Sequence, residues 1–212
     1  MEKILVIIVT YNGMEWMERC LDSLTRSTLP SDIFIVDNGS TDGTQDYIRT
    51  CGKDIIFRQS GENLGFGRAN NLGLQYAVDN GYDYVYLLNQ DAWVEEATFE
   101  TLINVHRSHP EYGILSPMQI QANGQHMDRN FLNGVASRCV DGNFMEDLYF
   151  GTLQDVYEVK DVMARLIPVG ILADESGNIR RSFLSLYDRR HDEKGIKLID
   201  QAPRKGAENL NI

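Results

Sequence analysis

Three short polar segments of this 212-residue sequence each follow an apolar run and carry side chains that could bind a nucleotide. The segments are TYN at 10–12, DNGSTD at 37–42 and NQD at 89–91. A carboxylate such as Asp37 can accept hydrogen bonds from a ribose hydroxyl or a base N–H, and the hard oxygens of Asp91 suit Mg²⁺ or Mn²⁺ bridging two phosphates. The segments therefore predict a site for a nucleoside diphosphate and a divalent cation.

The apolar runs before these segments predict β-strands in a covered sheet. Residues 4–9 are aliphatic without polar alternation, which is typical of a strand buried on both faces. The expected strands are 4–9, 32–37, 54–59, 82–89 and 112–120, and the expected helices are 14–24, a short helix through 47–48, one opening within 61–81, and 94–109. This alternation predicts an α/β fold with a mostly parallel central sheet between helices.

The same topology predicts that the three polar segments meet. Parallel strands all point the same way, so segments that follow strands 4–9, 32–37 and 82–89 emerge at one edge of the sheet, where such folds bind ligands. The chain carries a net charge of -11 and would repel a diphosphate. A bound cation is therefore expected to offset that repulsion.

Composition excludes several classes of protein. The 20 basic and 31 acidic residues oppose binding to a nucleic-acid backbone. Three widely spaced cysteines without a C-x-x-C pair suggest neither a disulfide framework nor a zinc site, which favours a reducing cytoplasm. Apolar stretches stay well short of the roughly 18 to 20 residues that a membrane-spanning helix needs, so contact with a membrane is expected to be peripheral at most.

The periodic signals weaken beyond residue 121. Several strand pieces but no helix are expected there, in a less regular and partly antiparallel part of the chain. Residues 179–205 form a basic tail with eight Lys or Arg against four Asp or Glu. Such a tail is usually a solvated surface, and its alternative reading is contact with an anionic, lipid-linked acceptor at the inner face of a membrane.

Four segments in register resemble a known family. VIIVTYNG, IVDNGSTDGT, NLGFGRANNLG and LLNQDA, in this order, are similar to the nucleotide-binding half of family 2 inverting glycosyltransferases of the GT-A fold, especially the bacterial rhamnosyltransferase-like branch. The resemblance implies one GT-A-like, three-layer domain with a Rossmann-like nucleotide-sugar-binding half at 1–120 and an acceptor-side half at 121–212. It implies metal-dependent transfer of a hexose from a UDP- or dTDP-linked sugar to a hydroxyl of a glycan or lipid-linked glycan, with inversion, in cell-wall or polysaccharide synthesis.

The resemblance also implies roles for individual residues. Thr10, Tyr11 and Asp37 would hold the nucleoside, and Asp91 of the D-x-D-like NQD segment would be the metal ligand. Because an amide oxygen ligates more weakly than a carboxylate, Asp91 and the diphosphate are expected to supply most of the binding. The further donor-side positions are Asn12, Asn38, Asn63, Gly65, Arg68, Asn71, Asn89 and Gln90.

The last fifty residues depart from that family pattern. Relatives of this branch carry a Gly-Gly-Phe-Asp-like turn and a Glu-Asp pair, one of whose carboxylates is the general base. The turn is missing here, and the nearest acids are Asp188, Asp192 and Glu193. Inversion needs a base within hydrogen-bond reach of the acceptor hydroxyl, and the sequence assigns none. We therefore expect the chain to be altered or truncated relative to the family pattern.

Other readings of these segments stay open. A nucleotide-sugar-binding module without turnover would explain the missing Glu-Asp pair. GFGRAN at 65–70 comes within one residue of a dinucleotide fingerprint, which would indicate an NAD-dependent oxidoreductase, although that fingerprint belongs in the first βα unit. Asp91 could instead cap a helix starting near residue 94. Trp93 could be a packing group or a platform for a sugar.

Overall fold

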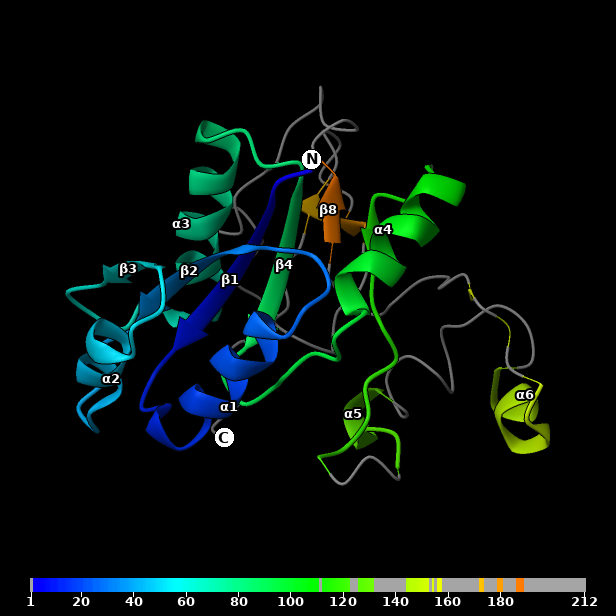
Figure 1. The fold of residues 1–212 in the computed structure, drawn as a ribbon, viewed down its shortest axis with the longest axis horizontal. Helices are drawn as coiled ribbons and strands as arrows, with labels where there is room; N and C mark the ends of the chain where they lie inside the picture. The colour runs from blue at the N-terminus through cyan, green and yellow to red at the C-terminus, as the bar shows by residue number, and fades with distance from the viewer. Residues whose placement is uncertain are drawn as a thin grey trace.

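The computed structural model describes residues 2–110, 112–122, 126–131, 144–152, 154, 156–157, 172–173, 179–180 and 186–188 (Figure 1). Its first helices and strands alternate as the sequence predicts. In chain order they are β1 (Ile4–Thr10), α1 (Met14–Thr25), β2 (Asp32–Asp37), α2 (Thr44–Thr50), β3 (Ile55–Gln59), α3 (Gly65–Asp79), β4 (Tyr84–Asn89), α4 (Thr98–Ser108) and β5 (Ile114–Leu115). Short elements follow: α5 (Arg129–Phe131), α6 (Phe144–Phe150), β6 (Leu172–Ala173), β7 (Ile179–Arg180) and β8 (Leu186–Asp188).

The main sheet has the strand order β3-β2-β1-β4-β8-β5. Strands β1 to β4 run parallel, and the antiparallel β8 lies between β4 and β5. β6 and β7 form a separate antiparallel pair. The expected mostly parallel α/β sheet is therefore confirmed. The chain order reverses direction at β1, which makes the junction of β1 and β4 the switch point where such sheets bind ligands.

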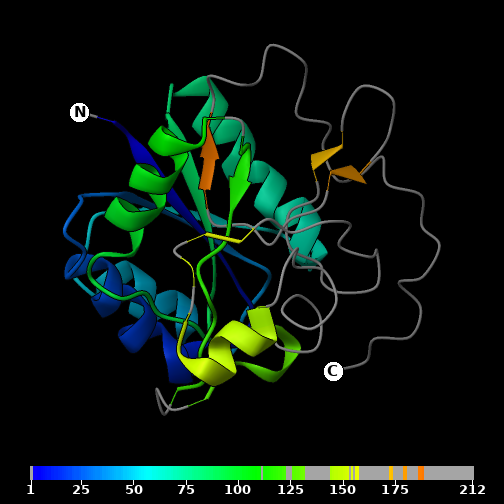
Figure 2. The same cartoon turned by 90° about the vertical axis from the view of Figure 1, so that its right-hand side faces the viewer.

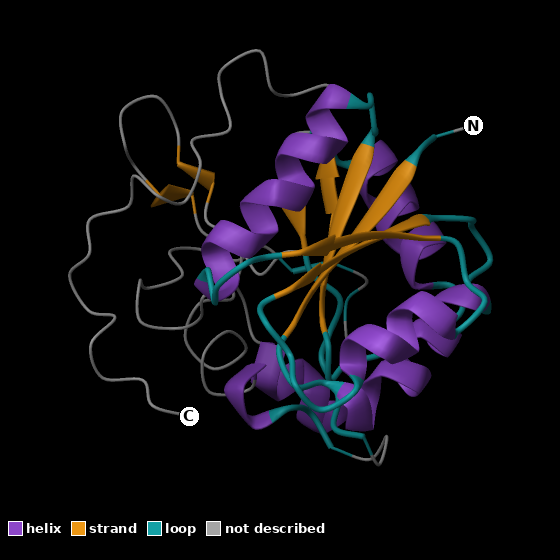
Figure 3. Cartoon of the chain, turned by 90° about the vertical axis from the view of Figure 1, so that its left-hand side faces the viewer, coloured by secondary structure: helices purple, strands orange, loops and turns teal. Residues whose placement is uncertain are grey.

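Helices cover both faces of the sheet, which gives three layers (Figures 2 and 3). Successive side chains of β1 alternate between two apolar cores because a strand directs neighbouring residues to opposite faces. Ile4, Val6 and Ile8 pack with residues of α1 and α4. Leu5, Ile7 and Val9 pack with residues of α3. The unbroken apolar run of β1 thus reflects burial on both faces.

Helix α3 approaches the sheet at a glycine. A methyl group at Gly73 would lie 2.6 Å from Cδ1 of Ile7 on β1. Only a residue without a side chain lets the helix pack this closely, which brings the amino-terminal part of α3 near the carboxyl ends of the strands. The glycine therefore sets the distance between α3 and the sheet edge that carries the polar segments.

Some expected boundaries were wrong. The helix expected at 94–109 begins at Thr98, and the strand expected at 112–120 is confined to Ile114–Leu115. That strand was expected to extend the parallel sheet, but β8 separates it from β4. No helix was expected beyond residue 121, yet α6 spans Phe144–Phe150 and stands away from the sheet in Figure 1.

Most of the basic tail at 179–205 lies outside the described residues. Within the part of the chain that the structure describes, every helix is too short or too polar to cross a bilayer.

Candidate functional site

The three polar segments lie together at one edge of the sheet. In the strand register, Thr10 is paired with Asp37, and its neighbour Val9 is paired with Asn89. Adjacent strands are about 4.8 Å apart, so the ends of β2 and β4 lie about 10 Å apart, on either side of β1. The convergence expected from the sequence is therefore present.

Asp37 is a buried carboxylate with one oxygen engaged and one open. Its Oδ2 accepts hydrogen bonds from the backbone amides of Gly39 and Ser40, both at 3.0 Å, and from Nε2 of Gln45 at 2.8 Å. Its Oδ1 is buried, and no described residue donates to it. A buried acceptor without a donor is costly to a fold. This atom is therefore suited to receive an N–H or O–H group from a ligand.

Asn38 links the end of β2 to the start of α3. Its Oδ1 accepts from the Leu64 amide at 3.3 Å, and its Nδ2 donates to the Gly65 carbonyl at 3.4 Å. The Oδ1 of Asn63 accepts from the Gly65 amide at 2.8 Å. Gly65 has φ of 73°, a left-handed conformation that favours glycine. These three predicted donor-side residues shape the loop that opens α3.

Asn12, just after β1, also connects two loops through hydrogen bonds. Its φ is 50°, in the left-handed region that asparagine tolerates. Its backbone amide donates to Oγ of Ser40 at 2.8 Å, and its Oδ1 accepts from the Thr41 amide at 2.8 Å. The Met14 amide donates to Oδ2 of Asp42 at 3.0 Å. The amide oxygen of Asn12 thus holds the loop after β1 against the loop after β2.

The loop after β1 is also joined to the turn after β4. Thr10 is fully buried, and its Oγ1 donates to Oε1 of Gln90 at 2.7 Å. The same Oε1 accepts from the Tyr11 amide at 2.9 Å, while Nε2 of Gln90 donates to the Tyr11 carbonyl at 3.3 Å. The Tyr11 side chain is 50% exposed at this edge. The Tyr11 ring is therefore available to a ligand, whereas the Gln90 amide is engaged with β1.

Helix α3 adds two buried amides. Asn71, predicted as a donor-side residue, is buried, and no described group donates to its Oδ1. Asn70, which was missed, has an equally unsatisfied Oδ1, while its Nδ2 donates to the Phe66 carbonyl at 2.9 Å. Its polar side chain on the core-facing side of α3 was the available sequence signal. Arg68, also predicted, is exposed on the first turns of α3.

The turn at Asn89–Asp91 carries the predicted metal ligand. The Ala92 amide donates to the Asn89 carbonyl at 3.1 Å, and both Asn89 and Asp91 are exposed. Because α4 begins only at Thr98, Asp91 does not cap it. Burial raises the pKa of the nearby Cys20 thiol to about 12, and the negative charge of Asp91 adds to that rise.

The residues of this turn fit a divalent cation only in part. In the described ranges, no three Asp, Glu, His or Cys side chains gather closely enough to hold a metal ion. Exposed oxygens of Asp91 and Asn89 are hard ligands of the kind that Mg²⁺ or Mn²⁺ prefers. Asp91 is therefore suited to be one ligand of a cation, whose other ligands would have to come from outside the side chains of this turn.

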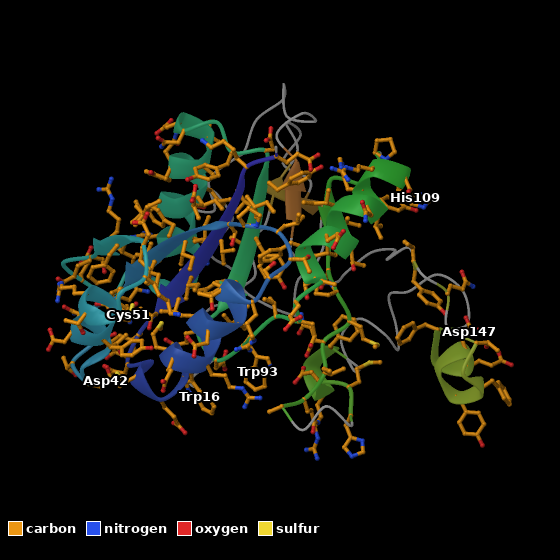
Figure 4. The ribbon with its side chains drawn as sticks, in the orientation of Figure 1. Trp16, Asp42, Cys51, Trp93, His109 and Asp147 are labelled. Atoms are coloured by element: carbon orange, nitrogen blue, oxygen red, sulfur yellow. The ribbon has the colours of Figure 1, made fainter. Side chains whose placement is uncertain are left out.

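Trp93 is packed against a guanidinium group. The Cζ atom of Arg19, on α1, lies 3.4 Å from the centre of the Trp93 ring, a cation–π contact. Figure 4 shows Trp16 near the lower end of α1 and Trp93 to the right of that helix. The contact fixes the orientation of the Trp93 ring and ties the segment after Asp91 to α1.

Asp188 is the catalytic candidate that the structure describes, and it lies away from this site. Asp188 pairs with Tyr84, at the amino end of β4, which is the edge of the sheet opposite Asn89. Asp192 and Glu193 lie outside the described residues. Among the described candidates, none therefore supplies a base beside Asp37 and Asp91.

The chain matches a family model. The model described as Glycosyl transferase family 2 matches residues 5–152. Over 122 residues the chain is 31% identical to the N-acetylglucosaminyl-diphospho-decaprenol L-rhamnosyltransferase of Mycobacterium tuberculosis, a match that covers 53% of this chain and 40% of that protein.

Solved structures share the fold. S. aureus TarS 1–349 in complex with UDP-GlcNAc matches with a TM-score of 0.52 and 22% identity, over 63% of this chain and 39% of TarS. The mannosyltransferase PcManGT from Pyrobaculum calidifontis, in complex with GDP-Man and Mn²⁺, matches with a TM-score of 0.50 and 24% identity, over 56% of this chain and 36% of its own. The chain thus spans about two fifths of each of these relatives, and the likeness shows the expected GT-A-like fold.

Proposed function

The chain belongs to glycosyltransferase family 2, and we propose that it transfers a sugar from a nucleotide-diphosphate sugar to a hydroxyl group of an acceptor. The observation that carries this proposal is the unsatisfied Oδ1 of the buried Asp37, beside Thr10 and on the same edge as Asp91. A nucleoside supplies the donor group that Oδ1 lacks, and its diphosphate would extend toward the turn after β4. The family match gives no support to an NAD-dependent oxidoreductase.

The proposed donor is a UDP- or dTDP-linked sugar. Asp37, Thr10 and Tyr11 would hold the nucleoside, with Asn71 beside it, and the loops fixed by Asn12, Asn38, Asn63 and Gly65 would shape the pocket. The TarS structure contains UDP-GlcNAc and the PcManGT structure contains GDP-Man, which supports a nucleotide sugar as the ligand class. Arg68, exposed at the start of α3, is proposed to face the donor.

The proposed cofactor is Mg²⁺ or Mn²⁺, with Asp91 as its carboxylate ligand and Asn89 beside it. PcManGT was solved with Mn²⁺, which supports a divalent metal. When bound, such a cation would offset the charge that develops on the diphosphate as the sugar departs. The chain's own part is to present Asp91 at a fixed distance from the nucleoside residues.

The proposed acceptor is a glycan or lipid-linked glycan, attacked with inversion at the sugar. The Mycobacterium tuberculosis relative is named for a diphospho-decaprenol-linked N-acetylglucosamine, which supports such an acceptor. Residues 121–212 are proposed to form the acceptor side of the domain, with residues 1–120 holding the donor. We place the reaction in the cytoplasm, at the inner face of the membrane, where the basic residues of 179–205 can meet anionic headgroups.

A second candidate function is donor binding without turnover. The position of Asp188 at the opposite edge of the sheet favours this alternative. Incubation with UDP- or dTDP-sugars separates the two functions. An enzyme releases UDP or dTDP, by hydrolysis or by transfer to an added acceptor, whereas a binding module holds the sugar nucleotide intact.

Calorimetric titration with UDP and dTDP, with and without Mn²⁺, tests donor binding. We expect one nucleotide to bind without metal and to bind more tightly with Mn²⁺. Asp37→Ala should weaken binding about tenfold or more under both conditions, because it removes a hydrogen bond to a charged acceptor. Asp91→Ala should remove only the effect of Mn²⁺.

The matched control is Asp79→Ala, which changes an exposed carboxylate on α3 and should leave both affinities unchanged. If the protein binds neither nucleotide, or binds NAD in preference to both, the proposed function is wrong.

A further inference from the structure

Gln90 lies in the turn proposed to bind the metal and contacts the residues proposed to hold the nucleoside. It follows Asn89 and precedes Asp91, yet its side chain points back to the loop after β1. Its Oε1 accepts from Oγ1 of Thr10 and from the Tyr11 amide, and its Nε2 donates to the Tyr11 carbonyl. One amide group therefore joins two loops that are eighty residues apart in the chain.

The glycine at position 13 leaves room for the contact between Gln90 and Thr10. A Cβ atom at Gly13 would lie 2.7 Å from Oγ1 of Thr10 and would overlap Oε1 of Gln90. Gly13 has φ of -102° and ψ of 14°, so its backbone does not require glycine. The absence of a side chain at Gly13 instead leaves room for the Gln90 amide.

We infer that Gln90 is a positioning residue that holds the metal-binding turn at a fixed separation from the nucleoside loop. This inference rests on the proposed function. A nucleoside diphosphate can use both ends of the site at once only if their spacing matches its own length. Gln90 fixes that spacing through Thr10 and Tyr11, so that binding of the cation and binding of the nucleoside favour one another.

The consequence is a coupling between two ligands. The ratio of the UDP dissociation constants without and with Mn²⁺ measures how strongly the metal favours nucleotide binding. By thermodynamic linkage, the same factor describes how UDP favours Mn²⁺ binding. A residue that only contacts the nucleoside changes both UDP constants equally and leaves the ratio unchanged, whereas loss of a positioning residue lowers the ratio.

The test is calorimetric titration of UDP into wild type and Gln90→Met, with and without Mn²⁺. Methionine keeps the bulk of the side chain but loses its hydrogen bonds to β1. We expect the enhancement by Mn²⁺ to fall about tenfold, within the usual range of coupling between sites. Titration of Mn²⁺ into the UDP complex should show the same loss, and thermal melting checks that the variant is folded.

Two further variants address the geometry. Gly13→Ala leaves Gln90 in the chain but fills its space, so it should reduce the enhancement in the same way and add little to Gln90→Met in the double variant. Gln90→Glu keeps an oxygen that can accept from Thr10 and Tyr11 but loses the donation to the Tyr11 carbonyl, so it should retain only part of the enhancement. Gln75→Ala, on the exposed side of α3, is the matched neutral control.

The outcomes separate the two proposals. If wild type does not bind UDP or dTDP, the proposed function fails, and the role of Gln90 fails with it. If wild type shows the Mn²⁺ enhancement and Gln90→Met keeps it, or loses affinity equally with and without metal, the positioning role alone is overturned. If Gln90→Met does not fold, Gly13→Ala decides the question by the same ratio.

Discussion

Cys20 shows how burial and a neighbouring charge control one side chain beside the candidate site. The thiol lies in the core between α1 and the turn after β4, and its Sγ is 3.8 Å from the Asn89 carbonyl. Burial, followed by the negative charge of Asp91, raises its pKa from 9.0 to about 12. The neutral thiol is therefore the form that the fold favours.

This pKa predicts a chemically inert cysteine. At pH 8 the folded protein should hold far less Cys20 thiolate than an exposed thiol would, and the thiolate is the reactive form. Alkylation with iodoacetamide, mapped by peptide mass spectrometry, should label the half-buried Cys51 in the folded protein and Cys20 only after denaturation. Equal labelling rates in the folded protein would contradict the prediction.

The raised pKa of Cys20 also makes the free energy of unfolding depend on pH. Because the folded pKa lies above the unfolded value, this contribution to stability is fully present below about pH 9 and is lost as the pH rises toward 12. A Cys20→Ser variant lacks the ionisation. Its unfolding free energy should therefore fall less steeply over this interval than that of wild type.

At the residue scale, the sequence indicated which side chains gather but not which of their atoms are satisfied. Asp37 was predicted from its place at a strand end, and its open Oδ1 agrees with a binding role that stays a prediction. The amides of Asn12 and Asn38 carry the same chemical signal, yet they hold loops. Asn70 was missed because its sequence signal, a polar residue on an amphipathic helix, does not reveal that its oxygen is buried without a donor.

At the scale of elements, the contact between α3 and β1 determines how closely that helix approaches the site. A methyl group at Gly73 would meet Cδ1, Cγ2 and Cγ1 of Ile7 at 2.6 to 2.8 Å. The helix must move away from the sheet or Ile7 must rearrange. The gain in helix propensity from replacing glycine, about 0.5 to 1 kcal/mol, is smaller than the cost of overpacking a core.

Gly73→Ala should therefore destabilise the protein by about 1 to 3 kcal/mol. Urea denaturation measures the change in unfolding free energy. In an Ile7→Ala background the same substitution should cost less, because the three atoms that it meets are then absent. Gly61→Ala is the matched control, since no atom lies within 4 Å of the added methyl group. Equal effects at Gly61 and Gly73 would show that packing is not the cause.

Strong periodicity explains why the elements from β1 to α4 could be predicted. Each is an apolar run or an amphipathic helix whose pattern is set locally. The later elements were predicted less well: β5 was expected as a longer strand at 112–120, and neither α6 nor β8 was located, since β5 and β8 have only two and three residues. Such short strands are defined by their partners rather than by their own sequence.

At the scale of the whole molecule, β8 completes the sheet. Its residues pair on one side with β4 and on the other with β5, and Tyr187 is opposite both Val85 and Ile114. Because β8 is paired on both sides, β5 is joined to the rest of the sheet through β8. Sequence patterns gave no sign of this arrangement, since they do not show which distant segment enters the sheet.

Tyr187→Pro should consequently lower the stability of the whole domain. Proline lacks the N–H group and is not tolerated between two paired strands, and the net value of a lost hydrogen bond alone is about 1 kcal/mol. Thermal melting followed by circular dichroism should show a lower Tm than for wild type. Tyr187→Val, a residue that favours strands, should melt close to wild type, and an unchanged Tm for the proline variant would mean that β8 does not support the sheet.

The late position of β8 also matters while the protein is being made. Tyr84 pairs with Asp188, about a hundred residues further along the chain, so a ribosome must translate about a hundred more residues before β4 gains its partner on that side. During this interval the backbone of β4 is an open edge that other nascent chains can join. Yield in a cell should thus depend on translation speed and on chaperones that shield the unfinished sheet.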